Sequence, residues 1–214
     1  MHYLNREQAG RELAEHLSSY RGRNDVTVLA LPRGGVPIAV EVAKAMAAPW
    51  DVFLVRKLGA PGQEELAFGA IAEGGLRVVH EPLTRALGLS PADVDAIADR
   101  ERGELDRRRA RYRGGRNLAP LDGRVALIVD DGLATGATME AAIQATRGLN
   151  ASQVVVAAPV GASDTCARLA TIADEVVCPL QPDPFDAVGL WYVDFTQVTD
   201  AEVEAMREQR SSKF

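Results

Sequence analysis

The chain of 214 residues is 47% hydrophobic and 25% charged, and its formal net charge is -6. This composition is typical of an ordinary globular domain, and the acidic balance argues against a broad basic surface for nucleic acid. Charged residues run through the first thirty positions and no apolar run approaches the roughly 20 residues of a membrane span, so we expect a cytoplasmic protein with no membrane partner.

The first part of the chain alternates helix and strand signals. Asn5 is a candidate N-cap, and apolar residues at helical spacing follow it up to Gly22. The short apolar run 26–31 predicts a buried strand, and helical periodicity resumes over 37–43 after a turn of proline and glycine. A second apolar strand is expected at 52–55.

The next segment gives weaker signals. Residues 58–69 have neither helical nor strand periodicity, which predicts a mobile loop. Beyond this loop, 70–72 and 77–79 are expected to pair as a small hairpin across Gly74 and Gly75.

A long helix is expected to begin after Ser90. Ser90 is a good N-cap, Pro91 suits the first helical position, and one apolar stripe then continues up to Gly114. Further strands are expected at 124–129, 154–158 and 175–178, and further helices at 136–149 and 162–173. Apolar strands that alternate with helices predict the α/β class, with a parallel sheet covered by helices on both faces.

The strongest functional signal follows the strand expected at 124–129. Asp130 and Asp131 come directly after it, where two carboxylates can accept hydrogen bonds from vicinal sugar hydroxyls. Ligands of such sheets bind at the carboxyl ends of the strands, and amides at a helix N-terminus can surround a phosphate. The residues expected to bind it are Ala134, Thr135, Gly136, Ala137 and Thr138. A Walker loop and a dinucleotide-binding loop are excluded because their glycine and lysine patterns are missing.

The run 125–139 resembles the phosphoribosyl pyrophosphate signature of type I phosphoribosyltransferases, with apolar residues, two acids and a Thr-Gly-x-Thr turn. The resemblance implies a Rossmann-like parallel sheet flanked by helices, in a single domain over 1–214 with a C-terminal hood at about 180–214. A helical insert at about 81–121 has no counterpart in the family. The resemblance also implies a homodimer and a nucleotide-salvage transferase that uses Mg2+ to move 5-phosphoribosyl to a nitrogenous, purine-like acceptor.

A second segment resembles the family loop that binds pyrophosphate. It contains Arg33, Gly34 and Gly35, whose guanidinium and amides can bind phosphate oxygens. Lys57 follows the strand expected at 52–55, where it either faces the ligand or belongs to a solvated basic pair. By the resemblance, Arg33 and Lys57 act on the leaving pyrophosphate and the two acids hold the ribose diol. No residue is expected to bind magnesium directly; the ion would lie near the acids through substrate and water.

The acceptor side of the site is less defined. Phe185 and Trp191 lie in a segment that resembles the base-binding part of purine phosphoribosyltransferases, and either they stack on a planar acceptor or they form the hood core. Family enzymes for 6-oxopurines have a lysine where this chain has Ala158, which argues against that acceptor. The resemblance also identifies 58–69 as a mobile loop that excludes water during the reaction.

Three hypotheses remain: a phosphoribosyltransferase, a non-catalytic sensor of phosphoribosyl pyrophosphate, and an RNA-binding regulator on the same fold. Retention of both acids, Arg33 and Lys57 favours catalysis. The arginine-rich helix at about 91–113 is either a solvated or subunit-contact face or a site for an anionic partner. Cys166 and Cys178 lack the spacing of a metal site and are expected to be core thiols.

Overall fold

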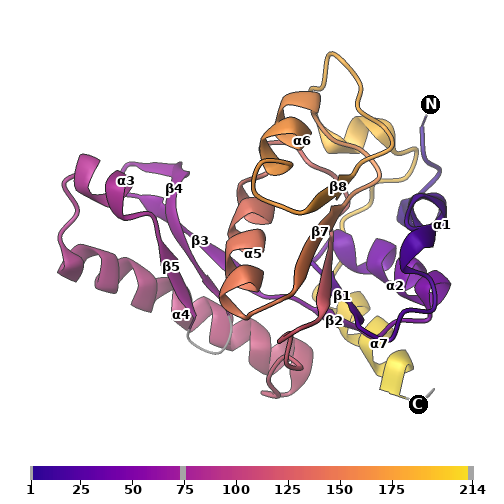
Figure 1. The fold of residues 1–214 in the computed structure, drawn as a ribbon, viewed down its shortest axis with the longest axis horizontal. Helices are drawn as coiled ribbons and strands as arrows, with labels where there is room; N and C mark the ends of the chain where they lie inside the picture. The colour runs from indigo at the N-terminus through magenta and orange to yellow at the C-terminus, as the bar shows by residue number, and fades with distance from the viewer. Residues whose placement is uncertain (1, 73–75, 212–214) are drawn as a thin grey trace.

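A five-stranded parallel sheet forms the centre of the computed structural model, which describes residues 2–72 and 76–211. The strands lie in the order β2 (Trp50–Val52), β1 (Val26–Ala30), β6 (Val125–Val129), β7 (Gln153–Ala157) and β8 (Glu175–Val177) (Figure 1). Every residue of β1 and β6 is buried, which explains their unbroken apolar sequences. The parallel sheet predicted from the sequence is confirmed.

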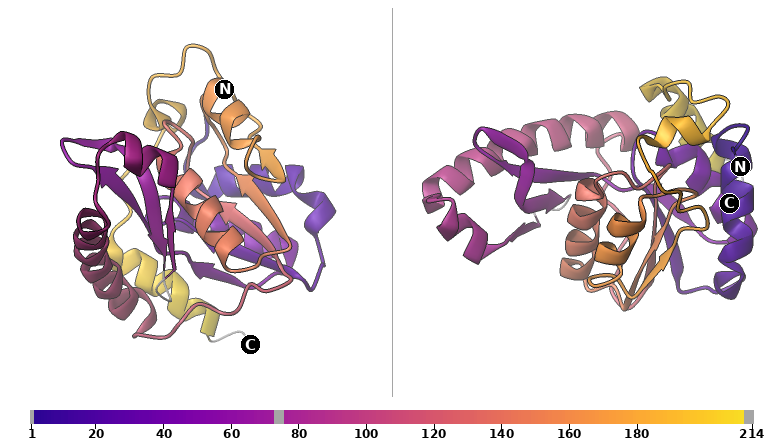
Figure 2. Two further views of the ribbon diagram at one scale, coloured as in Figure 1. Left: turned by 60° about the vertical axis from the view of Figure 1, so that its left-hand side comes forward. Right: turned by 90° about the horizontal axis from the view of Figure 1, so that it is seen from above.

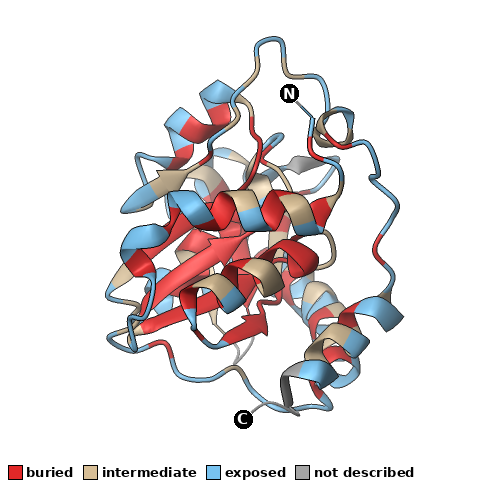
Figure 3. Ribbon diagram, turned by 90° about the vertical axis from the view of Figure 1, so that its right-hand side faces the viewer, coloured by how far each residue is buried: buried red, intermediate tan, exposed pale blue. Residues whose placement is uncertain are grey.

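Helices cover both faces of this sheet (Figure 1). One face packs against α1 (Arg6–His16) and α2 (Gly35–Met46), and the other packs against α5 (Ala137–Gly148) and α6 (Ser163–Leu169). Figure 3 shows the consequence, with buried strands inside and exposed outer surfaces on the covering helices. As expected, Asn5 caps α1 by accepting a hydrogen bond from the amide of Gln8.

A second, antiparallel sheet stands beside α5 and contains β3 (Val55–Ala60), β4 (Gln63–Ala72) and β5 (Arg77–Val79). Together with α3 (Glu81–Ala86) and α4 (Pro91–Arg113) it forms a lobe that extends away from the central sheet (Figures 1 and 2). The long helix α4 begins as predicted, since the side chains of Ser90 and Asp93 form a capping box.

Two predictions in this lobe need correction. The segment 58–69 is not a loop, because most of it belongs to the β3–β4 hairpin, which turns at Gly62. Leu58 and Phe68 are fully buried in the same apolar cluster as Leu105 of α4, so long-range packing stabilises strands that the local sequence barely indicates. The pairing of 70–72 with 77–79 is confirmed, while the turn residues 74–75 lie outside the described part of the chain.

The strand expected at 52–55 was placed too late in the chain. The core strand β2 ends at Val52, and β3 of the small sheet begins at Val55. Arg56 and Lys57 are therefore β3 residues and do not follow the end of a central strand.

The C-terminal segment contacts both the helices of the central sheet and the lobe that contains α4. A 3-10 turn, η3 (Val188–Trp191), is followed by α7 (Asp200–Ser211), which packs against α2 and α4. Cys166 and Cys178 are unpaired and buried, as expected of core thiols. Within the described residues, none of the helices has the length and apolar character needed to span a membrane.

Candidate functional site

The turn between β6 and α5 presents backbone amides at the carboxyl edge of the sheet. Two side chains of α6 hydrogen-bond to carbonyls of this turn. Thr165 Oγ1 donates to the carbonyl of Ala134 at 2.6 Å, and Arg168 donates to the carbonyl of Thr135. Within the described residues, no hydrogen bond uses the amides from 134 to 138. A run of unused amides at a helix N-terminus is suited to bind an anion.

Gly136 gives this turn its shape. It adopts a left-handed conformation with φ of 72°, directly before the first residue of α5. A Cβ at this position would lie 2.7 Å from the Thr165 methyl group, so the approach of α6 also requires glycine. The five residues expected to bind phosphate are thus brought together on one continuous turn.

The two predicted acids, Asp130 and Asp131, form a half-buried pair directly before this turn. The amide of Asp131 donates to Oδ1 of Asp130 at 2.8 Å. Burial, and then the charge of Asp131, raise the pKa of Asp130 well above its ordinary value. Burial also raises the pKa of Asp131, although the guanidinium of Arg6 opposes that shift.

Arg6 is a site residue that the sequence did not reveal. Its Nε and Nη2 atoms lie 2.9 and 2.8 Å from Oδ2 of Asp131, and its Nη1 atom donates to the carbonyl of Thr196 at 2.8 Å. Its guanidinium also lies 4.0 Å from the centre of the Phe195 ring. Arg6 follows the N-cap of α1 and lies 125 positions from Asp131 in the chain, so nothing in the local sequence distinguished it from an ordinary helix residue.

The glycines of the turn after β1 pack directly onto the acids. A Cβ on Gly34 would lie 1.9 Å from Oδ2 of Asp131, and a Cβ on Gly35 would lie 2.5 Å from the carbonyl oxygen of Val129. Both are therefore required by contact with the acid turn. The peptide bond between Pro32 and Arg33 is cis.

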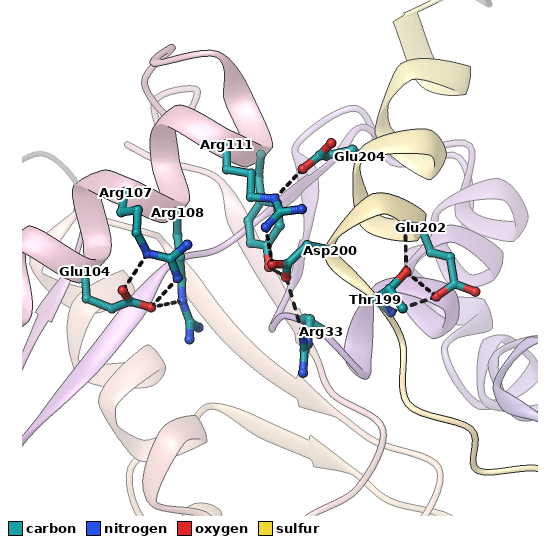
Figure 4. Close-up of polar contacts among 10 residues, drawn as sticks. Arg33, Glu104, Arg107, Arg108, Arg111, Thr199, Asp200, Glu202 and Glu204 are labelled. Atoms are coloured by element: carbon teal, nitrogen blue, oxygen red, sulfur yellow. Dashed lines mark hydrogen bonds and ion pairs between the residues drawn. The ribbon is translucent and has the colours of Figure 1, made fainter.

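Arg33 projects from that turn toward the junction of α4 and α7. Its guanidinium lies 3.5 Å from Asp200, the first residue of α7. Asp200 also accepts hydrogen bonds from Arg111 at 2.7 Å and from Tyr112 at 2.5 Å, both in α4 (Figure 4). The side chain of Arg33 remains 36% exposed, so a phosphate could reach it.

Lys57 meets both phosphate-type turns at one cavity. This cavity has a volume of about 400 Å³, and its lining includes Lys57, Pro32 beside Arg33, and Thr138 at the start of α5. Lys57 thus lies on β3 and not at the end of a core strand, and its role in binding a ligand stays a prediction.

The sequence profile of the phosphoribosyl transferase domain family matches residues 2–189, which is most of the chain. The chain belongs to this family. The resemblance noted from the acid turn and the glycine turn is therefore confirmed, and both turns lie within the matched region.

Relatives of this phosphoribosyl transferase domain support the assignment. Two curated proteins of Mycobacterium tuberculosis, from strains CDC 1551 and H37Rv, carry provisional names as phosphoribosyl transferases, and each is 51% identical over 209 residues. These matches cover 98% of this chain and 47% of each relative, so the chain spans about half the length of the curated relatives it matches.

Solved structures give the same fold. The crystal structure of TT1426 from Thermus thermophilus has a TM-score of 0.91 and 43% identity, covering 98% of this chain and 99% of that chain. A hypoxanthine-guanine phosphoribosyltransferase from Bacillus anthracis has a TM-score of 0.50 and 10% identity, covering 86% of this chain and 85% of that chain. The second likeness shows the fold alone.

The aromatic residues of the phosphoribosyl transferase domain's C-terminal segment pack together beside the acids. Phe185 and Trp191 are half-buried against Tyr3 and Tyr192, and the Trp191 ring stacks on His2 with centroids 5.6 Å apart. The hydroxyl of Tyr192 donates to the carbonyl of Asp131 at 2.6 Å. The segment therefore lies against the acid turn, and its aromatic rings contribute to a small apolar cluster there.

Gly34→Ala should disturb the acid pair of the phosphoribosyl transferase domain, because its added Cβ would lie 1.9 Å from Oδ2 of Asp131. The added methyl group would displace Asp131. Overpacking of this kind typically lowers the free energy of unfolding by about 1–3 kcal/mol. We expect binding of ribose 5-phosphate, measured by titration calorimetry, to weaken at least about tenfold as the acid pair is displaced.

A matched control is Gly103→Ala in the exposed middle of α4, where nothing lies within 4 Å of the added Cβ. That change should leave binding intact and stabilise the helix by about 1 kcal/mol. If Gly34→Ala bound ribose 5-phosphate as tightly as the unmodified chain, the contact between the turn after β1 and the turn after β6 would not be required for binding.

Proposed function

We propose that this chain transfers the 5-phosphoribosyl group of phosphoribosyl pyrophosphate to a nitrogenous acceptor and releases pyrophosphate. The observation that carries the proposal is the segment 134–138, whose amides make no hydrogen bond in the described structure and lie beside a half-buried pair of aspartates. Amides suit the 5-phosphate, and carboxylates suit the ribose hydroxyls one step further along the sugar. Membership of the phosphoribosyl transferase domain family supports the same ligand.

The proposed reaction is a displacement at C1 of the ribose. The bond from C1 to the pyrophosphate oxygen breaks and its electron pair leaves with the pyrophosphate. The lone pair of the acceptor nitrogen forms the new bond to C1, and the acceptor's N–H proton passes to water. Arg33 and Lys57 would stabilise the departing negative charge, as would the amides of Gly34 and Gly35. Asp130 and Asp131 would hold the diol.

Magnesium fits this site as an ion carried by the substrate. Among the described residues, no three His, Cys, Asp or Glu side chains are placed to hold a metal together. The acid pair supplies two carboxylates, and that of Asp131 already pairs with Arg6. Mg2+ commonly keeps several waters and binds through substrate phosphates, which matches such a sparse donor set. When bound, it would neutralise charge on the pyrophosphate.

The acceptor is proposed only as a nitrogenous compound. Ala158 is fully buried at the end of β7 and carries no donor for a purine carbonyl, which argues against a 6-oxopurine. Phe185 and Trp191 pack in the same cluster as Tyr192, whose hydroxyl bonds to Asp131, and we propose that one of these rings contacts a planar acceptor.

An RNA-binding role receives less support from the charges on α4. Most of its arginines are ion-paired with acids, which gives the helix a mixed rather than a basic surface. Binding to RNA phosphates favours a continuous basic patch. The expected homodimer stays a prediction, which light scattering of the purified chain can test.

Release of pyrophosphate tests the proposed function. We expect the chain, supplied with labelled phosphoribosyl pyrophosphate, Mg2+ and a panel of purines, pyrimidines and other amines, to release pyrophosphate with one acceptor class, and Gly34→Ala to be inactive. Saturable binding without turnover across the panel would indicate a sensor. Absence of binding to any ribosyl phosphate would refute the phosphate-turn assignment.

A further inference from the structure

Two arginines of α4 are placed differently from the other exposed arginines of that helix. Most of the others point to acids on α4 or α7 and have their charge balanced there. These pairs are Arg102 with Asp99, Arg107 with Glu104, Arg109 with Asp106, and Arg111 with Asp200 and Glu204. Arg100 and Arg108 also pair with acids of α4, Glu101 and Glu104, but they differ in that they line the cavity of about 400 Å³ between α4, β3 and the turn after β1.

This cavity has a basic rim and an apolar base. Four cationic side chains and a single carboxylate line it, namely Arg56, Lys57, Arg100, Arg108 and Glu101. Its remaining walls include the buried side chains of Phe53 and Leu105. Apolar walls lower the local dielectric and strengthen any ion pair formed inside, so the cavity favours a compact, multiply charged anion.

Glu101 does not cancel this positive charge. Both Nε and Nη2 of Arg56 donate to the same oxygen of Glu101, at 2.8 and 2.6 Å. Arg100 reaches the other oxygen at 3.3 Å from a largely exposed position. One carboxylate thus serves two cations, so cationic side chains outnumber carboxylates in the lining, which also includes Pro32 and Thr138.

Arg108 is the best-placed of these cations. Its Nε atom donates to Oε1 of Glu104 at 2.7 Å, and Arg107 donates to both oxygens of the same carboxylate (Figure 4). Hydrogen bonds to Arg107 and then Arg108 lower the pKa of Glu104 to about 2, so it stays ionised at neutral pH. Within the described part of the chain, the terminal nitrogens of Arg108 make no hydrogen bond, and this guanidinium is fixed at one edge only.

We propose that Arg108, with Arg100 at the rim, binds the pyrophosphoryl end of the ribosyl donor and stabilises it as it leaves. The inference rests on the proposed function and deepens it, because it makes the insert helix α4 part of the same site. When the C1–O bond breaks with its electrons on the pyrophosphate, Arg108 and Lys57 would face the new charge from two different elements, α4 and β3. The terminal nitrogens of a guanidinium match phosphate oxygens in pairs, which a single ammonium does not.

The test compares Arg108→Gln with Arg107→Gln. Both variants remove one partner of Glu104, but only Arg108 lines the cavity, so Arg107→Gln controls for the lost ion pair. Titration calorimetry would measure inorganic pyrophosphate and ribose 5-phosphate separately, with Mg2+. We expect Arg108→Gln to weaken pyrophosphate binding by about tenfold or more, with ribose 5-phosphate affinity unchanged. Arg108→Lys should recover part of the loss.

The outcomes separate this inference from the proposed function. Equal pyrophosphate affinity in Arg108→Gln and the unmodified chain would overturn the role of Arg108, as would an equal loss in Arg107→Gln. An unmodified chain that binds ribose 5-phosphate but not pyrophosphate would overturn the leaving-group site alone. Failure to bind either compound would overturn the proposed function itself. Circular dichroism of each variant checks that α4 remains folded, and Arg100→Gln against Arg102→Gln repeats the comparison at the rim.

Discussion

Arg6→Met should destabilise the protein by about 3–5 kcal/mol, because it removes the cation that compensates a buried carboxylate. The side chains of Arg6 and Asp131 are only 9% and 16% exposed. Methionine can fill the space against Phe195 but cannot donate to Asp131 or to the carbonyl of Thr196. Urea denaturation at neutral pH measures the loss.

The loss in Arg6→Met should depend on pH in a defined direction. Arg6 opposes the rise in the pKa of Asp131 caused by burial, so its removal lets that pKa rise further. A raised carboxyl pKa means that the folded state binds more protons than the unfolded state, and stability then falls as pH rises through that window. The destabilisation should therefore grow as pH rises above the ordinary pKa of an aspartate and shrink as the solution is acidified.

Arg23→Met provides the control, because it breaks an Arg–Asp pair of the same type whose side chains are about 40% exposed. It should leave unfolding unchanged within experimental scatter, since exposed ion pairs contribute little. Equal losses in the free energy of unfolding for the two substitutions would show that the contact between Arg6 and Asp131 stabilises the fold no more than an exposed ion pair does.

Asp130→Asn should weaken ribose 5-phosphate binding by about 10- to 100-fold, the value of charged hydrogen bonds to the diol. The same change should stabilise the free protein, because burial and the charge of Asp131 disfavour ionised Asp130. The asparagine oxygen can still accept the hydrogen bond from the amide of Asp131, which keeps the turn in place. Titration calorimetry should show the weaker binding, and thermal melting should show the higher stability.

The stability gain in Asp130→Asn should grow with pH. In the unmodified chain the folded pKa of Asp130 lies well above its ordinary value of 3.8, so stability is lost as pH rises between these two values. The asparagine variant lacks that loss. Asp122→Asn replaces an exposed acid before β6 and is the matched control for the change in net charge. A melting temperature of Asp130→Asn below that of the unmodified chain at pH 8 would contradict the argument.

The sequence predicted most of the central sheet because its signals are local. The apolar strands at 26–31 and 124–129, and the cap at Ser90, depend on residues close together in the chain. The β3–β4 hairpin was missed because its strands are stabilised by distant partners, with Leu58 and Phe68 packed against α4. The proline and glycine at its turn were an available signal.

The site was predictable only where its residues adjoin a recognisable turn. Asp130 and the turn 134–138 form one continuous segment, so their motif could be identified. Arg6 belongs to the same site through a contact across 125 residues, and its α1 sequence has no feature that distinguishes it from a surface arginine. Arg108 could not be identified from the sequence either, because it differs from its neighbour Arg107 only in lining the cavity of the folded chain.

The bonds from α6 to the carbonyls of Ala134 and Thr135 mean that the turn proposed to bind phosphate is already organised before a ligand arrives. A ligand then gives up its own freedom but does not also have to order its receptor, which is a large part of the cost of binding elsewhere. Even inorganic phosphate should therefore show measurable affinity, and residues of α6 that never touch the ligand should tune it.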